Sequence, residues 1–360
     1  MKDHIMIVGF IAILVLFPVV GIFLPDQEVS NSERRNLAMF PNVIENGKVN
    51  FDFFDEFNEY VVDQFPGRDF FRTVKVISQF SIFGHLENDG VFVKDGMVYE
   101  TSHLNRESLS NFAQKLNRIQ EKYLDESNSI YYSVIPNKIN YLEDDKYPRV
   151  DYDEVVLSLK ESLSEDFQFI DISDALNKES YYATDIHWRQ ETLDGVVSKL
   201  LQSMNIEAIP TSYEEHSFSD FAGSLYSKIA LPVSKEKLIY RTNSLLDSIL
   251  VYNYEKNRME PVYQDEYYSH VDSYDVFLGG ATPLLVIDNP ELENDKKLII
   301  FRDSFASSLT PLLISSYDEI TLVDLRYIGT DYLEGIVDFK DSDILFLYSD
   351  EVINNSYLLK

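Results

Sequence analysis

The sequence contains no cysteine, which excludes disulfides, thiolate catalysis and cysteine-based metal sites. Positive charge is also scarce: 31 Lys and Arg residues are outnumbered by 61 Asp and Glu residues, and the formal net charge is −30. Nucleic-acid binding needs a basic surface that displaces counterions, so this charge balance argues against it. The same excess of negative charge disfavours broad docking on anionic lipid.

Apolar and aromatic residues are plentiful. Apolar residues make up 45% of the 360 residues, and the aromatic ones include 24 Tyr and 24 Phe. A chain of this length could form two average domains or one large domain with insertions. The composition predicts a folded chain with a large core and little disorder.

The N-terminus carries a long uncharged run, from Ile5 to Leu24. A helix of about 20 residues rises about 30 Å, which matches the hydrocarbon core of a bilayer. The run is longer than the apolar region of most signal peptides, and no small-x-small cleavage site follows it. We therefore expect residues 1–25 to be an uncleaved membrane anchor, with a cleaved signal peptide as the alternative. Export would place the rest of the chain outside the cytoplasm.

Short apolar runs alternate with helical patterns over most of the remaining chain. We expect residues 26–100 to form a tether followed by a helical and hairpin extension, and residues 101–360 to form one α/β domain with a parallel sheet flanked by helices. Tyr-rich runs and turns predict an irregular or β-rich insertion over residues 206–290. The expected helices are 51–65, a helix capped by Asn105, 152–164, 305–316 and 350–359; the expected strands are 130–135, 167–171, 297–301, 319–324 and 343–348, with a hairpin over 84–100.

An apolar run that begins at Lys297 stops abruptly at Arg302-Asp303-Ser304, and a helix-compatible segment follows. A parallel strand ends at the edge of its sheet, so this pattern predicts that the Ser304 hydroxyl lies there. At the start of a helix, free backbone N–H groups and the helix dipole can stabilise an oxyanion. The structural alternative is a helix N-cap made by Asp303 or Ser304.

Asp185 and His187 are the best candidates for a catalytic acid and base. In an extended segment, side chains two positions apart point the same way, so Asp185 could orient His187, which would deprotonate a serine. The alternatives are a structural histidine and, for Asp185, the N-cap of a helix that begins near Arg189. Trp188, the sole tryptophan, either lines the site and stacks on a sugar or packs in the core.

An Asp-x-His pair also suits metal binding. A metal site would need further ligands, and the sequence shows no second cluster of His and carboxylates that would complete one. We therefore expect no catalytic metal.

Several sequence blocks, in this order along the chain, together resemble the DHHW family, which is related to the alginate O-acetyltransferases and their SGNH-hydrolase-like domains. The block Ala183 to Trp188 is similar to the motif that names the family, although Ile186 stands where the second letter is His. The other blocks are 32–41, 136–138, 221–226, 277–280, 302–305 and 322–327.

The resemblance implies an SGNH-hydrolase-like α/β domain in which Ser304 is the nucleophile, His187 the base and Asp185 the acid that orients it. The Ser304 backbone N–H would be one oxyanion donor. Asn137 or the turn at Gly280 could supply a second donor. Arg302 could bind an acyl donor or a glycan carboxylate; a surface ion pair is its alternative.

The function that the resemblance implies is a membrane-anchored, extracytoplasmic O-acetyltransferase. It would transfer acetyl groups through an acyl-serine to a secreted or cell-wall polysaccharide, with a membrane-bound O-acyltransferase as its acetyl supplier and no soluble cofactor. Two alternatives stay open: a carbohydrate esterase that uses the same three residues, and a non-catalytic scaffold that binds or assembles glycans.

Overall fold

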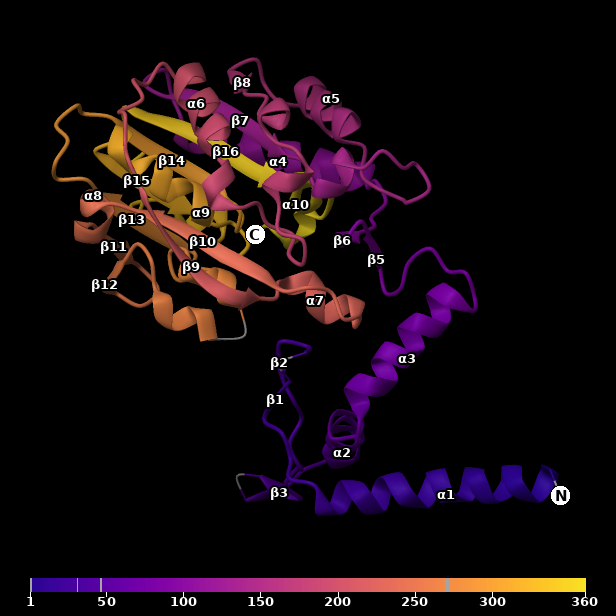
Figure 1. The fold of residues 1–360 in the computed structure, drawn as a ribbon. Coiled ribbons are helices and arrows are strands. Elements are labelled where there is room, and N and C mark those ends of the chain that lie inside the picture. The colour runs from indigo at the N-terminus through magenta and orange to yellow at the C-terminus, as the bar shows by residue number, and fades with distance from the viewer. Residues whose placement is uncertain (1, 31, 46, 270–271) are drawn as a thin grey trace. The chain divides into compact units, whose positions relative to one another are not determined.

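The computed structural model describes residues 2–30, 32–45, 47–269 and 272–360 (Figure 1). Residues 1, 31, 46 and 270–271, which belong to the expected anchor, tether and insertion, lie outside the described residues. The chain divides into two compact units. The N-terminal unit comprises residues 1–89 with 226–232, and the main unit comprises residues 90–225 with 233–360.

The N-terminal unit begins with one long helix, α1 (Lys2–Phe23), where the uncharged run predicted an anchor. Within the described residues, α1 is the one helix long and apolar enough to cross a membrane. The expected tether forms two small antiparallel pairs, β1 (Val29–Ser30) with β2 (Arg35–Asn36) and β3 (Ile44–Glu45) with β4 (Lys48–Val49).

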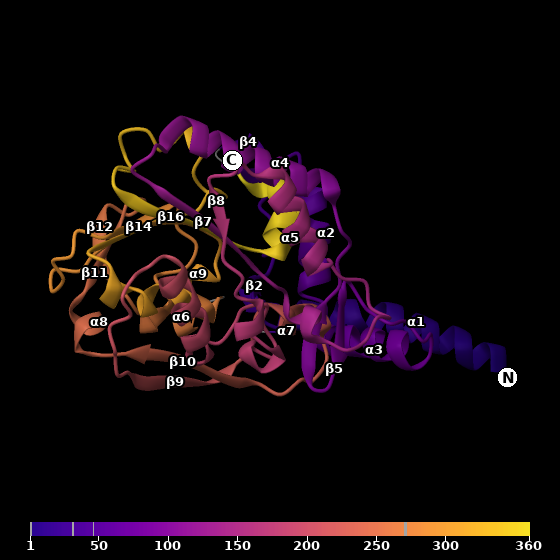
Figure 2. The same ribbon diagram turned by 90° about the horizontal axis from the view of Figure 1, so that it is seen from above.

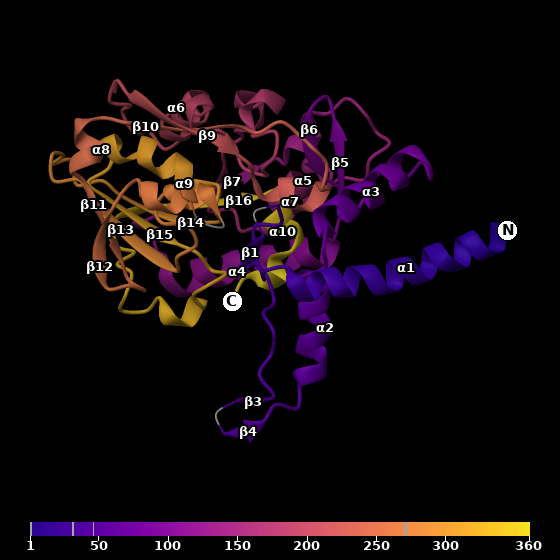
Figure 3. The same ribbon diagram turned by 60° about the horizontal axis from the view of Figure 1, so that its bottom comes forward.

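Two amphipathic helices follow in the N-terminal unit. The first, α2 (Phe53–Asp63), was predicted from its phenylalanine spacing; the second, α3 (Arg68–Ser81), was not. Gly67 separates them with a φ of +73°, a left-handed conformation that glycine adopts without strain. Helix α2 begins close to the β3–β4 pair and ends beside the C-terminal part of α1 (Figure 3). The segment 226–232 includes most of α7 (Ser224–Ile229).

The main unit is built on an eight-stranded sheet with the order β12-β11-β13-β15-β14-β16-β7-β8. Its strands are β7 (Ser129–Ile135), β8 (Phe167–Phe169), β11 (Leu250–Asn253), β12 (Arg258–Pro261), β13 (Leu284–Asp288), β14 (Lys297–Arg302), β15 (Glu319–Val323) and β16 (Ser342–Ser349).

The sheet is mixed, so the expectation of a parallel sheet holds for only part of it. Strands β15, β14, β16, β7 and β8 are parallel, whereas β13, β11 and β12 add on as antiparallel neighbours. Residues 254–257 form a turn between β11 and β12, and so short a connection permits only antiparallel pairing. Residues 206–290 are therefore β-rich, but they contribute strands to the central sheet and are not wholly an insertion.

Two further antiparallel pairs lie outside this sheet. Strands β9 (Glu214–Phe221) and β10 (Glu236–Thr242) form one of them. The predicted hairpin is β5 (Val91–Lys94) with β6 (Met97–Glu100). Its turn residues Asp95 and Gly96 have φ values of +50° and +80°, as a two-residue Asp-Gly turn requires.

Helices cover both faces of the sheet, with α4 on one side and α6 and α9 on the other (Figure 2). The α-helices of the main unit are α4 (Arg106–Tyr123), α5 (Tyr152–Ser162), α6 (Asp194–Ser203), α8 (Ser244–Ser248), α9 (Ala306–Leu309) and α10 (Asp350–Asn354). Short 3-10 turns lie at Lys138–Tyr141, Ser173–Ala175, Lys178–Ser180, Gln190–Thr192, Asp265–Ser269, Ser273–Val276, Thr310–Leu312, Ile314–Ser316, Thr330–Tyr332 and Ser356–Leu358. As predicted, the Asn105 side chain caps α4 by accepting a bond from the Ser108 N–H at 3.2 Å.

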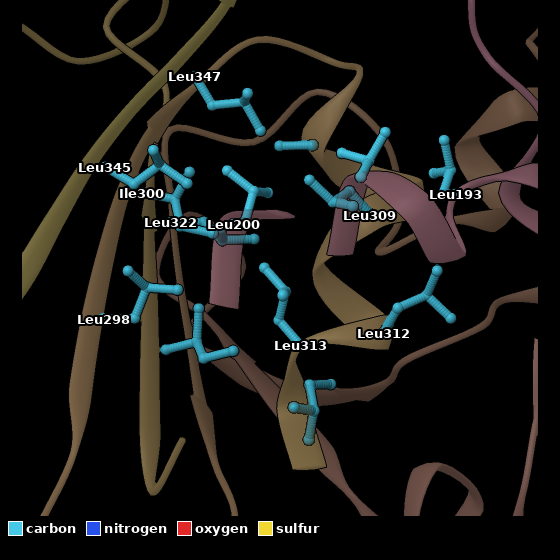
Figure 4. Packing of buried hydrophobic residues seen from close by; sticks show 14 of the residues in the cluster. Leu193, Leu200, Leu298, Ile300, Leu309, Leu312, Leu313, Leu322, Leu345 and Leu347 are labelled. Carbon is cyan, nitrogen blue, oxygen red and sulfur yellow. The ribbon is translucent and has the colours of Figure 1, made fainter. Parts of the chain in front are cut away.

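Strand β14 sends alternate side chains into two cores. Leu298 and Ile300 point into the core that α6 and α9 cover, where Leu309 also lies (Figure 4). Ile299 and Phe301 point into the opposite core, beneath α4. Because both faces are buried, the strand reads as a continuous apolar run, which is why the sequence located it correctly.

The helix expected over residues 305–316 is only partly formed. Helix α9 makes a single turn, and two 3-10 turns continue the segment. Pro311 lacks a backbone N–H and so cannot donate the i→i−4 bond that would extend an α-helix. The expected C-terminal helix over residues 350–359 is divided in the same way into α10 and a 3-10 turn.

Candidate active site

Ser304 lies at the carboxyl edge of the central sheet, directly after β14. Its neighbours Asp303 and Phe305 are buried, whereas Ser304 itself is partly exposed. Strands β15 and β16 flank β14 in parallel, so the serine stands near the middle of the parallel edge, where ligands of open α/β sheets bind.

Three side chains from two distant segments meet at this edge. The Ser304 Oγ lies 2.7 Å from His187 Nε2, and His187 Nδ1 lies 2.5 Å from Asp185 Oδ1. Asp185 is fully buried and His187 is 6% exposed. Burial opposes ionisation of Asp185, but the charge of His187 and the hydrogen bonds to the carboxylate outweigh it and hold the pKa of Asp185 below its usual value. A carboxylate that binds Nδ1–H leaves Nε2 free to accept the serine proton.

The loop that carries Asp185 and His187 is a tight bend and not the extended segment that the sequence suggested. Tyr181 and Trp188 pair as an antiparallel bridge, and the Tyr182 N–H donates to the His187 carbonyl at 3.1 Å. The Asp185 Oδ1 also accepts the His187 backbone N–H at 3.0 Å, so a local side-chain turn brings acid and base together. Asp185 is therefore not a helix N-cap; the nearest 3-10 turn begins at Gln190.

A glycine and a backbone amide hold the outer oxygen of Asp185. The Ser224 N–H donates to Asp185 Oδ2 at 2.6 Å. A Cβ on Gly223 would lie 2.2 Å from the Asp185 Cβ, so only glycine permits this approach. The block 221–226 was noticed as a resemblance, but no role was predicted for either residue.

Lys138 and Glu236 both bind the backbone of the loop that carries Asp185 and His187. The Lys138 Nζ is buried and donates to the carbonyl oxygens of Tyr182 and Asp185, both at 2.8 Å. Glu236 accepts the backbone N–H groups of Ala183 and Thr184 at 3.0 and 2.9 Å. These charge-assisted bonds fix the loop backbone where no regular secondary structure does. Burial lowers the pKa of Lys138 to about 7, against the opposing charges of Asp185 and Glu236.

Aromatic rings enclose the imidazole. Tyr274 stacks on His187 with ring centroids 3.9 Å apart and planes 7° apart, and its hydroxyl donates to Ser308 Oγ at 2.7 Å. Phe305 lies on the same imidazole at 4.9 Å. The sequence showed no signal for Tyr274, because the contact joins segments far apart in the chain.

The fold and the Ser304–His187–Asp185 arrangement can be compared with known proteins. No protein-family model matches the sequence, and no curated protein matches it. Among solved structures, a DHHW family protein from Eubacterium siraeum DSM 15702 is similar, with a TM-score of 0.62 and 21% identity over 74% of this chain and 92% of that one. The chain has a DHHW-type fold.

Bacillus cereus PatB1 also shares the DHHW-type fold. It is 18% identical, with a TM-score of 0.58 over 74% of this chain and 97% of PatB1, and a PatB1 structure with a sulfonyl adduct gives a TM-score of 0.57. The O-acetyltransferase domain of Pseudomonas putida AlgJ is a more distant likeness, with 10% identity and a TM-score of 0.46. Identities this low establish the fold and not the activity. The predicted resemblance to the DHHW family is confirmed at that level.

Asp303 has a structural position in this DHHW-type fold, although it is not the helix N-cap of the alternative interpretation, because Phe305 precedes α9 and no side chain caps it. Its Oδ1 accepts the Phe305 N–H at 3.1 Å, and its Oδ2 accepts the Ser349 N–H at 2.8 Å. Asp303 thereby ties the ends of β14 and β16 together beside Ser304.

Trp188 belongs to the core. Its ring is fully buried, and its Nε1 donates to the Phe305 carbonyl at 3.0 Å. A ring with no exposed surface cannot stack on a sugar, so of the two interpretations core packing is the one the structure supports. Through Phe305, Trp188 supports the segment that follows Ser304.

Arg302 is also fully buried, which contradicts the expectation of a surface ion pair. Its guanidinium donates to Ser307 Oγ at 2.8 Å and to the Gly280 carbonyl at 3.4 Å. With no exposed surface, it cannot bind an acyl donor or a glycan carboxylate directly. Both faces of β14 are buried, so the side chain of its last residue, Arg302, points into the protein on either face.

The second oxyanion donor stays a prediction. The Gly280 N–H already donates to the Phe277 carbonyl at 3.3 Å, which argues against Gly280. Asn137 is half-buried and uses its Oδ1 to accept the Ile139 N–H at 3.1 Å, and its side-chain amide is the remaining candidate. Among the described residues, none accepts a hydrogen bond from the Ser304 N–H, so this donor stays available.

The single turn of α9 gives little of the helix dipole expected to act at Ser304, so individual N–H donors matter more than the dipole.

Among the described residues, no group of three or more His, Cys, Asp or Glu side chains is placed to hold a metal ion.

Proposed function

We propose that this protein is a serine-dependent O-acetyltransferase that acts outside the cytoplasm on a secreted or cell-wall polysaccharide. The observation that carries the proposal is the continuous relay from Ser304 Oγ to His187 Nε2 and from His187 Nδ1 to Asp185, with contacts of 2.7 and 2.5 Å. The DHHW-type fold supports it, since the family resembles the alginate O-acetyltransferases.

The first step forms an acetyl-serine. The Ser304 Oγ attacks the donor's acetyl carbonyl while His187 Nε2 takes the hydroxyl proton, and Asp185 stabilises the imidazolium. The Ser304 N–H is available to bind the oxyanion. His187 then returns its proton to the leaving group, and the bond between the acetyl carbon and the leaving group breaks.

The second step transfers the acetyl group. A sugar hydroxyl attacks the acetyl-serine carbonyl as His187 takes its proton, and the same proton restores the Ser304 hydroxyl as the ester bond to the enzyme breaks. No soluble cofactor enters either step. Helix α1 would anchor the chain in one membrane pass, and a membrane-bound O-acyltransferase would supply acetyl groups.

The test is intact-protein mass spectrometry after exposure to a chromogenic acetyl ester. We expect one acetyl adduct on Ser304, which Ser304→Ala and His187→Ala abolish. Ser198→Ala, which changes an exposed serine of α6, is the matched control and should react normally. A sulfonyl fluoride should block the same serine, and the sulfonyl adduct of PatB1, which shares this fold, motivates that reagent. An adduct that persists in Ser304→Ala would contradict the proposal.

A carbohydrate esterase is the second candidate, because the same relay can activate water. Adding an oligosaccharide acceptor to the acetylated protein separates the two: a transferase yields acetylated sugar, and an esterase yields only free acetate. The third alternative, a non-catalytic scaffold, predicts no adduct on a folded protein.

A further inference from the structure

The N-terminal unit exposes a stripe of large apolar side chains along α3. Phe70 is 66% exposed, Val74 41% and Ile77 47%. They follow one another at steps of four and three residues, so they lie on one face of the helix. Soluble monomers rarely expose contiguous apolar surface of this kind without a partner.

A second face of α3, beside this stripe, already has its partner. The Arg72 Nη2 donates to the Ser227 carbonyl at 2.6 Å, and the Thr73 Oγ1 donates to the Ala230 carbonyl at 2.9 Å. Val76 follows Arg72 by four residues and Thr73 by three, so it shares their face, and it is 2% exposed. The segment 226–232 therefore contacts the face of Arg72 and Thr73 and leaves the neighbouring apolar stripe open.

The corner between α2 and α3, residues 64–67, packs with Phe71 against α1. Phe17 of α1 stacks on Phe65 with centroids 5.0 Å apart and meets the edge of Phe71 at 5.5 Å. One turn later on the same face of α1, a Cβ at Gly21 would lie 3.6 Å from Pro66. A small residue lets another segment approach a membrane helix closely.

If α1 spans the membrane, this contact fixes how deep in the membrane the corner lies. The inference therefore rests on the membrane anchor of the proposed function. Phe17 precedes the end of α1 by six residues, which places it about 9 Å inside the end of the helix. A segment that packs on Phe17 must lie at a similar depth. Interfacial helices bury their apolar faces about 5–10 Å into the boundary between headgroups and acyl chains.

We propose that the α2–α3 corner and the α3 stripe of Phe70, Val74 and Ile77 lie in the lipid surface, against acyl chains of the leaflet from which α1 emerges. Beside the corner, the ion pair between Arg35 Nη1 and Asp63 Oδ2, at 2.8 Å, marks the polar boundary. The chain's net charge of −30 gives anionic lipid no electrostatic advantage, so apolar insertion drives the contact and neutral lipid suffices.

The cysteine-free sequence makes this placement directly measurable, because a single introduced cysteine is the only site for a thiol-reactive dye. The full-length chain is placed in phosphatidylcholine nanodiscs with a polarity-sensitive dye at Val74→Cys or Ile77→Cys. Lys75→Cys is the matched control, because Lys75 lies on the same helix and pairs with Asp89 at 3.1 Å on the polar side. Val15→Cys reports the membrane span of α1 independently.

We expect blue-shifted emission at positions 74 and 77 that nitroxide-labelled lipid quenches, and water-like emission at position 75. Water-like emission at 74 and 77 with quenching at 15 would overturn the proposal and leave the anchor standing. Water-like emission at 15 as well would overturn the membrane anchor and this placement together. Blue-shifted emission that lipid-borne nitroxide does not quench would mean that protein covers the stripe, which also rejects lipid as the occupant. Circular dichroism of each variant checks that the label leaves the fold intact.

Discussion

The two units differ in how far their large apolar side chains are exposed to solvent. In the main unit, Phe112 of α4 is 2% exposed and packs under the sheet. In the N-terminal unit, Phe54 of α2 is 80% exposed, although both residues lie on amphipathic helices. Amphipathic patterning alone therefore says that a helix has an apolar face; it does not say whether protein or lipid covers that face. The main unit is stabilised by its own core, and the N-terminal unit presents its apolar face outward.

The sharpest test of this contrast is a pair of matched truncations. Phe112→Ala should lower the free energy of unfolding by about 3–5 kcal/mol, because it leaves a cavity in a packed core. Phe54→Ala should change it by less than about 0.5 kcal/mol, because an exposed ring loses little on removal. Chemical denaturation of both variants in detergent measures the difference. Equal losses would mean that the protein itself covers the N-terminal helices.

A change at Gly223 tests how tightly the main unit is packed around Asp185. Gly223→Ala places a methyl group where the Asp185 Cβ already lies, so we expect about 1–3 kcal/mol of destabilisation and slower acetylation of Ser304. Gly329→Ala is the control, because its φ is −75° and its nearest neighbour would be 3.4 Å away. Thermal unfolding and the adduct assay measure both effects. A normal acetylation rate in Gly223→Ala would show that the approach to Asp185 is not functional.

A change at Lys138 tests whether its bonds to the loop that carries Asp185 and His187 affect the turnover rate as well as the stability. Lys138→Met keeps the length of the side chain but leaves the carbonyls of Tyr182 and Asp185 without their donor, at a cost of about 1–3 kcal/mol. We expect kcat for acetyl-ester turnover to fall about tenfold with little change in KM, since the substrate does not touch this buried residue. The exposed Lys160→Met is the control. A fall in stability with an unchanged kcat would assign Lys138 a purely structural role.

The smallest expected effect concerns the pH dependence of the main unit. Burial raises the pKa of Asp350 to about 7, against hydrogen bonds from the Asn137 N–H at 2.9 Å and from the Asn140 Nδ2 at 2.8 Å. A carboxyl with a raised folded-state pKa holds its proton longer in the folded state, so its contribution to stability is lost as the pH rises toward 7. Between pH 5.5 and 6.5 the loss should be about 1 kcal/mol. Asp350→Asn, which mimics the protonated acid, should remove this part of the slope in denaturation curves measured at the two pH values.

The sequence predicted the elements and residues that local patterns encode. The strand before Ser304 is apolar on both faces, the cap at Asn105 is a local bond, and the Asp-x-His spacing lies within one bend. Lys138, Gly223 and Tyr274 were missed, because their roles consist of contacts with residues that are distant in the chain.

The errors have the same cause. Strand β13 reads as a strand from its composition, but its antiparallel place beside β15 depends on long-range pairing. Both interpretations of Arg302, binding of a donor or glycan carboxylate and a surface ion pair, needed an accessible side chain, yet the strand that ends with Arg302 is buried on both faces.

The bend that carries Asp185 and His187 has neither a helix nor a strand, but three of its amide hydrogens are bound by side-chain carboxylates. Those of Ala183 and Thr184 donate to the Glu236 carboxylate, and that of His187 donates to Asp185. Their exchange with solvent deuterium therefore requires ionic contacts to break and not merely a loop to flex. Protection from exchange in this loop should therefore depend on hydrogen bonds to two side-chain carboxylates and not on regular secondary structure.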